Sequence, residues 1–266
     1  MLQKGTGRQH AQGRTRQDPR PSLAPSFPAA PSVHSTHSLN TQISTLSDLR
    51  SEGDALQATL ALNETEDTWE KINRALKRFQ AVVRGGAATR FPDDFVALLR
   101  DPRTAKPLVR SIVTERGALS GTALELVASC TRLGPQFEPL LPIYLPPILR
   151  LFGRPNKVYT TRAAATVASI VKNTRLAKCL QYLVVEWRSE AGKSASFREH
   201  AAATVALMLG TDAGALAVDK DALERRIQDL EWVIKTGATG REPSVRSDMK
   251  KCWLVYKREW PERVHA

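Results

Sequence analysis

Residues 157–171 read KVYTTRAAATVASIV, and the fold follows from the spacing of their apolar side chains. The apolar residues fall one, three or four positions apart, so an α-helix would place them on a single face. Three consecutive alanines, residues 163–165, keep part of the helix surface small, which lets a second helix approach closely. The predicted stripe consists of Ala163, Val167, Ile170 and Val171.

Three further segments repeat this template of a polar or Gly/Pro loop, a polar first turn and an apolar stripe. Their stripes are Leu119, Ala123, Leu126, Val127 and Cys130; Phe197, Ala201, Val205, Met208 and Leu209; and Val245, Met249, Cys252, Trp253 and Tyr256. The four helices begin near residues 119, 157, 195 and 242. The steps of about 38, 38 and 47 residues are close to the period of HEAT-type helix pairs.

A second helix is predicted before each of these four, and one further pair precedes them. The additional helices are expected at residues 91–114, 138–152, 175–190 and 219–236, with the first pair at 47–62 and 67–84. Glycines and prolines lie where turns are needed, and no alternating strand pattern with hairpin turns is present. The sequence therefore predicts an all-α, HEAT-type solenoid of about five helix pairs over residues 45–264.

The N-terminal segment, residues 1–42, differs in composition from the rest. Its first 40 residues hold five prolines, five serines and five basic residues against one acid, with Phe27 as the only aromatic residue. Such a segment buries too little apolar surface to offset its ordering entropy, so we predict a disordered basic arm. It has no apolar core of a signal peptide, and it lacks the apolar face that the alternative of a transit peptide would require.

The whole chain of 266 residues carries 39 Lys+Arg against 27 Asp+Glu, a formal net charge of +12. Two thirds of this excess belongs to residues 41–266, so the predicted solenoid is itself basic and an acidic partner is expected. The longest apolar stretch, residues 139–149, is broken by four prolines, and no membrane span is predicted.

The cysteines and histidines indicate neither a disulfide framework nor a metal site. Cys130, Cys179 and Cys252 form no CxxC motif, and all three lie on predicted apolar faces, which favours inert core thiols in a reducing compartment. The five histidines do not cluster with carboxylates. There is no phosphate-binding glycine loop and no paired nucleophile and base. Acid pairs such as Asp93 and Asp94 lie at helix starts, where they favour the helix dipole. We therefore expect no enzyme and no cofactor.

The turns inside the helix pairs of a solenoid line up along one edge, and here they carry the informative residues. The first turn, residues 63–68, is acidic and leads directly into Trp69. Two interpretations stay open for Trp69. It is either a hydrophobic staple or partly buried cap residue, or an exposed anchor for a partner, because Trp is enriched in binding hot spots.

The other four turns contain basic residues: Arg116, then Arg154 and Lys157, then Lys193, then Arg241. Arg162, Arg198 and Arg246 follow just inside the next helices. Singly, each is a solvated surface charge. Together they predict a positive stripe beside one Trp, reinforced by helix N-termini. The three helical arginines have an equal alternative, in which they bridge neighbouring repeats through carboxylates or helix ends.

The ordered set of these motifs resembles a TOG domain, and within that class the CLASP family of microtubule-associated proteins. The resemblance covers about residues 45–264. It rests on DTWEKINRALKRF at 67–79, the helix at 122–134 that ends Cys-Thr-Arg-Leu-Gly, the turn at 156–162, and Pro-Ser-Val-Arg at 243–246 followed by Trp-Pro at 260–261.

The resemblance implies binding of the αβ-tubulin heterodimer along the edge of loops, with a Trp of the first loop and basic residues of later loops in contact. The positions carried over are Trp69, residues 115–116, 156–157, 193–194 and 241–244. At the second loop the family usually has an Asp-Leu-Arg-Ser-type string, whereas this chain has Thr-Glu-Arg-Gly at 114–117, so that Gly117 loosens the expected geometry. The expected tubulin-binding residues are Trp69, Arg116, Asn156, Lys157, Lys193, Arg241 and Arg246.

The expected function is therefore a non-catalytic module that binds tubulin and microtubules and regulates microtubule dynamics, with other spindle or plus-end proteins as further partners. The implied location is the cytoplasm and its microtubules, the mitotic spindle, and the nucleus or kinetochore during mitosis. CLASP-type proteins are much longer, so the chain is expected to be a fragment or truncated product. The main alternative is a HEAT-repeat adaptor that binds another protein through its concave face. Nucleic-acid binding is a third reading that we do not expect, because few aromatic residues lie among the basic turns to stack on bases.

Overall fold

The computed structural model describes residues 41–264, and every regular element in this range is a helix. Most of the predicted arm, residues 1–40, lies outside the described residues. The backbone N–H of Thr41 donates to the carbonyl of Ala81 at 3.0 Å, and Ile43 is buried. Contact with the helical domain therefore includes Thr41, which lies within the predicted arm of residues 1–42.

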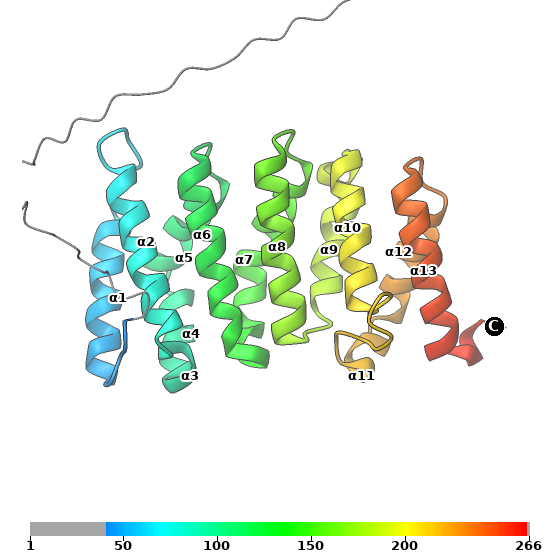
Figure 1. Cartoon of the computed structure of the whole chain (residues 1–266), viewed down its shortest axis with the longest axis horizontal. Coiled ribbons are helices and arrows are strands. Elements are labelled where there is room, and N and C mark those ends of the chain that lie inside the picture. Colours follow the sequence, from blue (N-terminus) through cyan, green and yellow to red (C-terminus); the bar gives the residue numbers. More distant parts are fainter. Residues whose placement is uncertain (1–40, 265–266) are drawn as a thin grey trace, which may run out of the picture. The chain divides into compact units, whose positions relative to one another are not determined.

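Five helix pairs stack side by side, as the sequence predicts (Figure 1). The pairs are α1 (Leu46–Leu60) with α2 (Trp69–Arg84), α4 (Pro92–Arg100) and α5 (Pro102–Val113) with α6 (Gly117–Cys130), α7 (Leu141–Arg150) with α8 (Lys157–Thr174), α9 (Cys179–Arg188) with α10 (Ala195–Met208), and α12 (Ile227–Ala238) with α13 (Pro243–Glu259). Short elements connect them: α3 (Ala87–Arg90), α11 (Lys220–Glu224) and the 3-10 helices η1 (Thr131–Leu140), η2 (Leu151–Gly153), η3 (Glu190–Lys193) and η4 (Pro261–Arg263).

The helices form two layers, and each helix contacts its neighbours in the same layer. One layer follows the order α2, α6, α8, α10, α13, and the other follows α1, α5, α7, α9, α12. This nearest-neighbour packing is characteristic of solenoids, in which each repeat buries its apolar face against the next one.

Three of the predicted helices are shorter or divided. The expected helix at 91–114 breaks at Asp101, which is extended (φ −55°, ψ 126°) because the residue before Pro102 avoids helical geometry. The expected helix at 219–236 divides at Arg226, which also leaves helical geometry. The helix expected from residue 175 begins only at Cys179, since Arg175 adopts the left-handed conformation (φ 57°) that ends α8.

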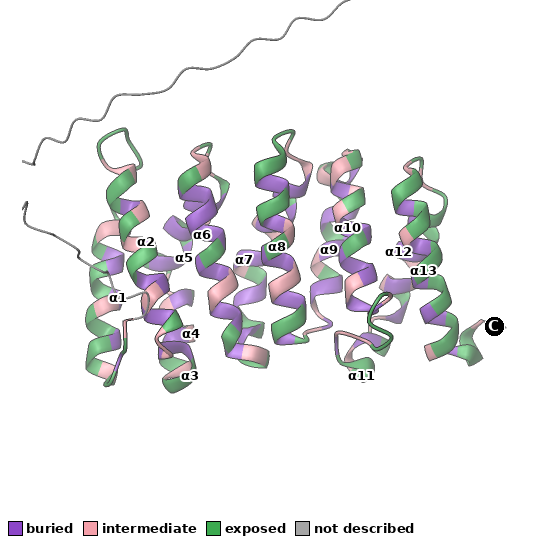
Figure 2. Ribbon diagram, in the orientation of Figure 1, coloured by how far each residue is buried: buried purple, intermediate pink, exposed green. Residues whose placement is uncertain are grey.

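The core is continuous along the stack, and the predicted stripes form part of it (Figure 2). Every stripe residue is buried except Trp253, whose exposed fraction is 39 %. The prediction for Trp253 is therefore wrong. Its helix, α13, is the last α-helix in the described part of the chain, and no later repeat covers its outer face there.

The three cysteines are buried free thiols. Burial raises the pKa of Cys179 and of Cys252 to about 12 and that of Cys130 further, so the thiols stay protonated near neutral pH. Among residues 41–264, no His, Cys, Asp or Glu side chains gather into a group able to hold a metal ion. None of the helices in this range is both long and apolar enough to cross a bilayer.

Candidate functional site

The loops inside the five helix pairs lie along one edge of the stack, which is the upper edge in Figure 1. We call this edge the intra-pair ridge. It consists of the loops at residues 61–68, 114–116, 154–156, 189–194 and 239–242, together with the first turn of the helix that follows each loop.

Trp69 is the first residue of α2 and is half-buried beneath a guanidinium group. The Cζ atom of Arg116 lies 5.6 Å from the centroid of the Trp69 ring, a cation–π distance. Trp69 is thus neither a core residue nor a freely projecting anchor. This placement agrees with the interpretation as a partly buried residue at the helix start, and it leaves part of the ring available to a partner.

Arg116 is held by two carboxylates of the first loop. Its Nη2 lies 2.7 Å from Glu66, and its Nε lies 3.1 Å from Glu64. The hydrogen bond from Arg116 lowers the pKa of Glu66. Arg116, which the sequence offered as a free positive contact, is therefore largely neutralised and instead covers one face of Trp69.

Arg154 ties the third loop to the second. Its guanidinium donates to the backbone carbonyls of Val113 and Thr114 at 2.5 and 3.4 Å and lies 3.1 Å from the carboxylate of Glu115. It also stacks over the ring of Tyr159, whose hydroxyl donates to the carbonyl of Glu115 at 2.6 Å. The two loops are consequently joined into one unit.

A further residue of the third repeat anchors the end of the second loop. Arg162 donates to the carbonyl of Gly117 at 2.8 Å, and a Cβ at Gly117 would meet only the Tyr159 hydroxyl, at 3.7 Å. The looser geometry expected from Gly117 is thus opposed by the hydrogen bonds that Arg154, Tyr159 and Arg162 of the neighbouring repeat donate to residues 113–117.

The three helical arginines serve the fold rather than form a recurring free row. Arg162 bridges to the previous repeat through Gly117, and Arg198 bridges to the next one, where its Nε lies 3.0 Å from Glu242. Arg198 and Arg246 also each donate to two carbonyls of the loop before their own helix. The bridging alternative is therefore confirmed for Arg162 and Arg198. Arg162 lies two positions deeper in its helix than the other two, so the sequence match between them was offset.

The remaining predicted site residues are exposed. Asn156 is the N-cap of α8, where its side-chain oxygen accepts from the backbone N–H of Val158 at 2.9 Å. Lys157 and Arg241 form no ion pair with any residue between 41 and 264. Lys193 lies 2.8 Å from Glu190, but both side chains are largely solvated, so this pair neutralises little in water.

The ridge differs at its second loop from the predicted arrangement of an acidic first turn followed by four basic turns. Its first two loops are acidic or neutralised, and its available cations begin at the third loop with Lys157 and continue with Lys193, Arg241 and Arg246. The physical reason is that carboxylates of the same loops face the arginines of neighbouring loops across the stack. The signal was present as Glu residues in these loops, but their partners lie about 40 to 50 positions away.

Sequence reasoning also missed the apolar part of the ridge. Leu62 in the first loop, Val113 at the second and Val158 at the third are exposed by 39, 37 and 51 %. Leu62 lies two residues after the end of α1, Val113 is the last residue of α5 and Val158 is the second residue of α8, so all three lie where the helical stripe no longer predicts burial. With Trp69 they place one or two partly exposed apolar side chains at each of the first three loops.

This fold and this ridge define a HEAT-type helical-repeat protein in which each repeat contributes one loop to a single exposed edge. Within that class, the chain belongs to the CLASP N-terminal family, which matches residues 49–266. The resemblance that residues 67–79 and the later turns indicated is thereby confirmed.

The chain is similar to several fungal proteins named STU1. It is 25 % identical over 207 residues to Protein STU1 of Chaetomium globosum, covering 76 % of this chain and 18 % of that protein. It is 25 % identical to Protein stu-1 of Neurospora crassa, covering 76 % of this chain and 17 % of that protein. The chain thus spans less than a fifth of the length of these curated relatives. Among solved structures, the designed armadillo repeat protein YIII(Dq)4CqI is 15 % identical, with a TM-score of 0.40 over 79 % of this chain and 86 % of the other.

Proposed function

We propose that this chain is a non-catalytic module that binds the αβ-tubulin heterodimer and microtubules through the intra-pair ridge and thereby regulates microtubule dynamics. Membership of the CLASP N-terminal family supports this function. The proposed place of action is the cytoplasmic microtubule array and the mitotic spindle, including the kinetochore, with other spindle or plus-end proteins as further partners.

The observation that carries the proposal is the order of apolar and positively charged side chains along the ridge. A half-buried Trp69 and neighbouring exposed apolar residues occupy the first three loops, and unpaired or solvated cations occupy the third to fifth loops. A partner with an apolar contact at one end and an acidic surface toward the other would match both parts. Apolar contacts of a Trp give affinity, while the cations give orientation and a fast encounter.

We assign Arg116 a different part in this proposal from the one the resemblance implied. Because two carboxylates hold it over Trp69, its guanidinium fixes the orientation of the indole ring. The direct cationic contacts would instead come from Lys157, Lys193, Arg241 and Arg246, with Asn156 shaping the third loop as an N-cap.

Microtubule co-sedimentation of matched variants tests the proposal. Lys157 and Lys172 are both exposed on α8, one at the ridge and the other in its last turn at the opposite edge. We expect Lys157→Glu and Trp69→Ala each to weaken binding by about tenfold, and Lys172→Glu to change it by less than about twofold. Circular dichroism confirms that the variants keep their helices.

Equal losses in Lys157→Glu and Lys172→Glu would show that binding follows net charge and not the ridge. Unchanged binding in both Trp69→Ala and Lys157→Glu would contradict the proposal and favour the adaptor alternative, since an adaptor that uses a helix face is indifferent to the ridge.

A further inference from the structure

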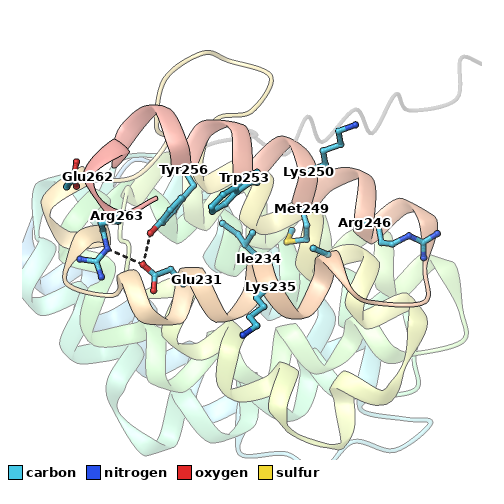
Figure 3. Close-up of a pocket in the computed structure, with 11 residues that line it drawn as sticks. Glu231, Ile234, Lys235, Arg246, Met249, Lys250, Trp253, Tyr256, Glu262 and Arg263 are labelled. Atoms are coloured by element: carbon cyan, nitrogen blue, oxygen red, sulfur yellow. Dashed lines mark hydrogen bonds and ion pairs between the residues drawn. The ribbon is translucent and has the colours of Figure 1, made fainter. Parts of the chain in front are cut away.

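The outer face of the last repeat carries an open groove between α12 and α13, closed at one end by η4 (Figure 3). Its volume is about 1120 Å³. The floor is apolar and is formed by Ile234, Ala238, Met249 and Tyr256, and the indole of Trp253 stands beside it.

The same face is covered in the preceding repeats. The helices α13 and α12 pack on α10 and α9, respectively, and so complete the fourth pair. Nothing within residues 41–264 does this for the fifth pair. A terminal repeat of a solenoid normally has a polar outer face, whereas here Trp253 is 39 % exposed and stacks on Tyr256 with ring centroids 5.3 Å apart. The groove is thus built like an inner contact surface of the stack.

The charges around this apolar floor are mainly positive. Lys235 lies on the α12 side, and Arg246, Lys250 and Lys257 lie along α13, where Lys257 Nζ is 5.9 Å from the Trp253 ring. The acids gather at the closed end. There Glu231 is already engaged, because it accepts from the Tyr256 hydroxyl at 2.6 Å and lies 3.1 Å from Arg263.

Charge complementarity selects among the possible occupants. A second copy of this chain would bring the same lysines face to face across the groove. The segment at residues 1–40 carries five basic residues against one acid and only Phe27 as an aromatic side chain, so it is repelled and offers little to fill an apolar floor. Both occupants are disfavoured by like charges.

We propose that the α12–α13 groove is a docking site for an amphipathic helix of another protein, with large apolar side chains on one face and acidic residues on both flanks. The helix takes the place that the next repeat of the stack would occupy. Its apolar side chains at positions i, i+3 or i+4, and i+7 lie on the floor beside Trp253, and its carboxylates face Lys235, Lys250 and Lys257. This site is separate from the loops that the proposed tubulin contact uses, apart from Arg246 at its edge.

A designed peptide serves as the probe. It is a fluorescein-labelled 18-residue helix with leucines at i, i+3, i+4 and i+7 and glutamates on both flanks, and a control peptide has lysine in place of each glutamate. We expect fluorescence anisotropy with the full chain to show binding of the acidic peptide that is at least about tenfold tighter than that of the lysine peptide. Equal binding of the two peptides would overturn the proposal.

Two matched pairs of variants locate the binding. Trp253 and Leu254 are adjacent, exposed apolar residues on α13, and Lys250 and Lys251 are adjacent, exposed lysines; only the first of each pair lines the groove. We expect Trp253→Ala and Lys250→Glu to weaken binding of the acidic peptide by about tenfold, and Leu254→Ala and Lys251→Glu by less than about twofold. Equal effects within either pair would overturn the proposal.

Two further measurements test whether a second copy of the chain or its own residues 1–40 occupy the groove. Dimerisation of the wild-type chain by light scattering that Trp253→Ala abolishes would assign the groove to a second copy. Tighter peptide binding after deletion of residues 1–40 would assign it to the N-terminal segment. Either result overturns the proposal. Because Trp253 and Lys250 lie off the ridge, microtubule co-sedimentation of their variants is expected to stay unchanged, so the two proposals fail separately.

Discussion

At the scale of single residues, Arg116 contacts an aromatic ring and two carboxylates at the same time. Its planar guanidinium stacks on the Trp69 ring while its N–H groups point to Glu64 and Glu66. The Glu66 carboxylate is largely exposed, so the pair contributes little to stability. Its consequence is local: it fixes the indole and removes one positive charge from the ridge.

Removal of that carboxylate is expected to strengthen the proposed tubulin contact. In Glu66→Gln, Arg116 keeps only Glu64 and gains net positive potential beside Trp69. Asp67→Asn is the matched control, because Asp67 is exposed in the same loop and forms no ion pair within the described range. We expect Glu66→Gln to raise microtubule affinity by about two- to fivefold at low salt, an advantage that is lost at high salt. Co-sedimentation at two ionic strengths measures it, and an equal gain in Asp67→Asn would refute this account of Arg116.

The half-buried Trp69 and the exposed Trp253 mark the limit of residue-level prediction. Trp69 directly follows an acidic loop, and this position was enough to separate it from the core. Trp253 fits the helical stripe of α13 as well as Met249 does, yet it is exposed whereas Met249 is buried. Periodicity tells which side chains share a face, but not whether a neighbouring element covers that face.

At the scale of helices, the pair of Arg198 on α10 and Glu242 at the start of α13 links the fourth and fifth repeats. Both side chains are mostly buried, exposed by 23 and 12 %. The hydrogen bond from Arg198 lowers the pKa of Glu242. Since the folded-state pKa lies below the unfolded value of about 4.3, the pair stabilises the fold above that pH. This stability is lost as the pH falls through the lowered pKa.

Urea unfolding of Glu242→Gln should reveal this pH dependence. At pH 7 we expect the variant to lose about 1–3 kcal/mol of unfolding free energy, because Arg198 keeps its charge without its carboxylate partner. Near pH 3 the difference from the wild type should shrink, since the wild-type carboxylate is itself becoming protonated. Glu125→Gln, an exposed position on α6, is the control and should lie within about 0.5 kcal/mol at both pH values. A constant difference at both pH values would contradict an ionic role for Glu242.

The helix pairs were predictable because their signals are local, whereas the contacts between loops were not. Stripes such as Ala163 to Val171 can be found within a few residues of sequence. The break before Pro102 has an equally local signal, but the prediction of one helix over 91–114 missed it. The partners Arg154 and Glu115, by contrast, meet only because two loops of adjacent repeats are stacked together. Their pairing depends on the exact length of the helices between them, and propensities fix helix ends only to within a few residues.

At the scale of the whole molecule, the solenoid has two ends that are less supported than its middle. Inner helices such as α8 pack between two neighbours in their layer, while α13 packs on α10 alone among the layer's helices within residues 41–264. Stability in such a stack is a sum of repeat and nearest-neighbour contributions, so local opening should be easiest at the ends.

The three buried thiols report this gradient without any substitution. Cys252 lies on terminal α13, Cys179 on α9 and Cys130 on α6. We expect iodoacetamide at pH 8 to label native Cys252 at least about fivefold faster than Cys130, because opening of the last repeat exposes it. Mass spectrometry of the separated peptides measures the rates. In urea all three should react alike, and identical native rates would instead indicate one cooperative opening of the whole stack.

The ties between neighbouring loops also constrain how such a chain can change over generations. Arg198 and Glu242 stand 44 positions apart, yet a substitution at either one leaves a mostly buried charge without its partner. We therefore expect the two positions to change together, and to a lesser degree Arg154 with Glu115. Sequence drift along the ridge should proceed by neighbouring loops together, so that related chains show correlated changes at these positions in place of independent ones.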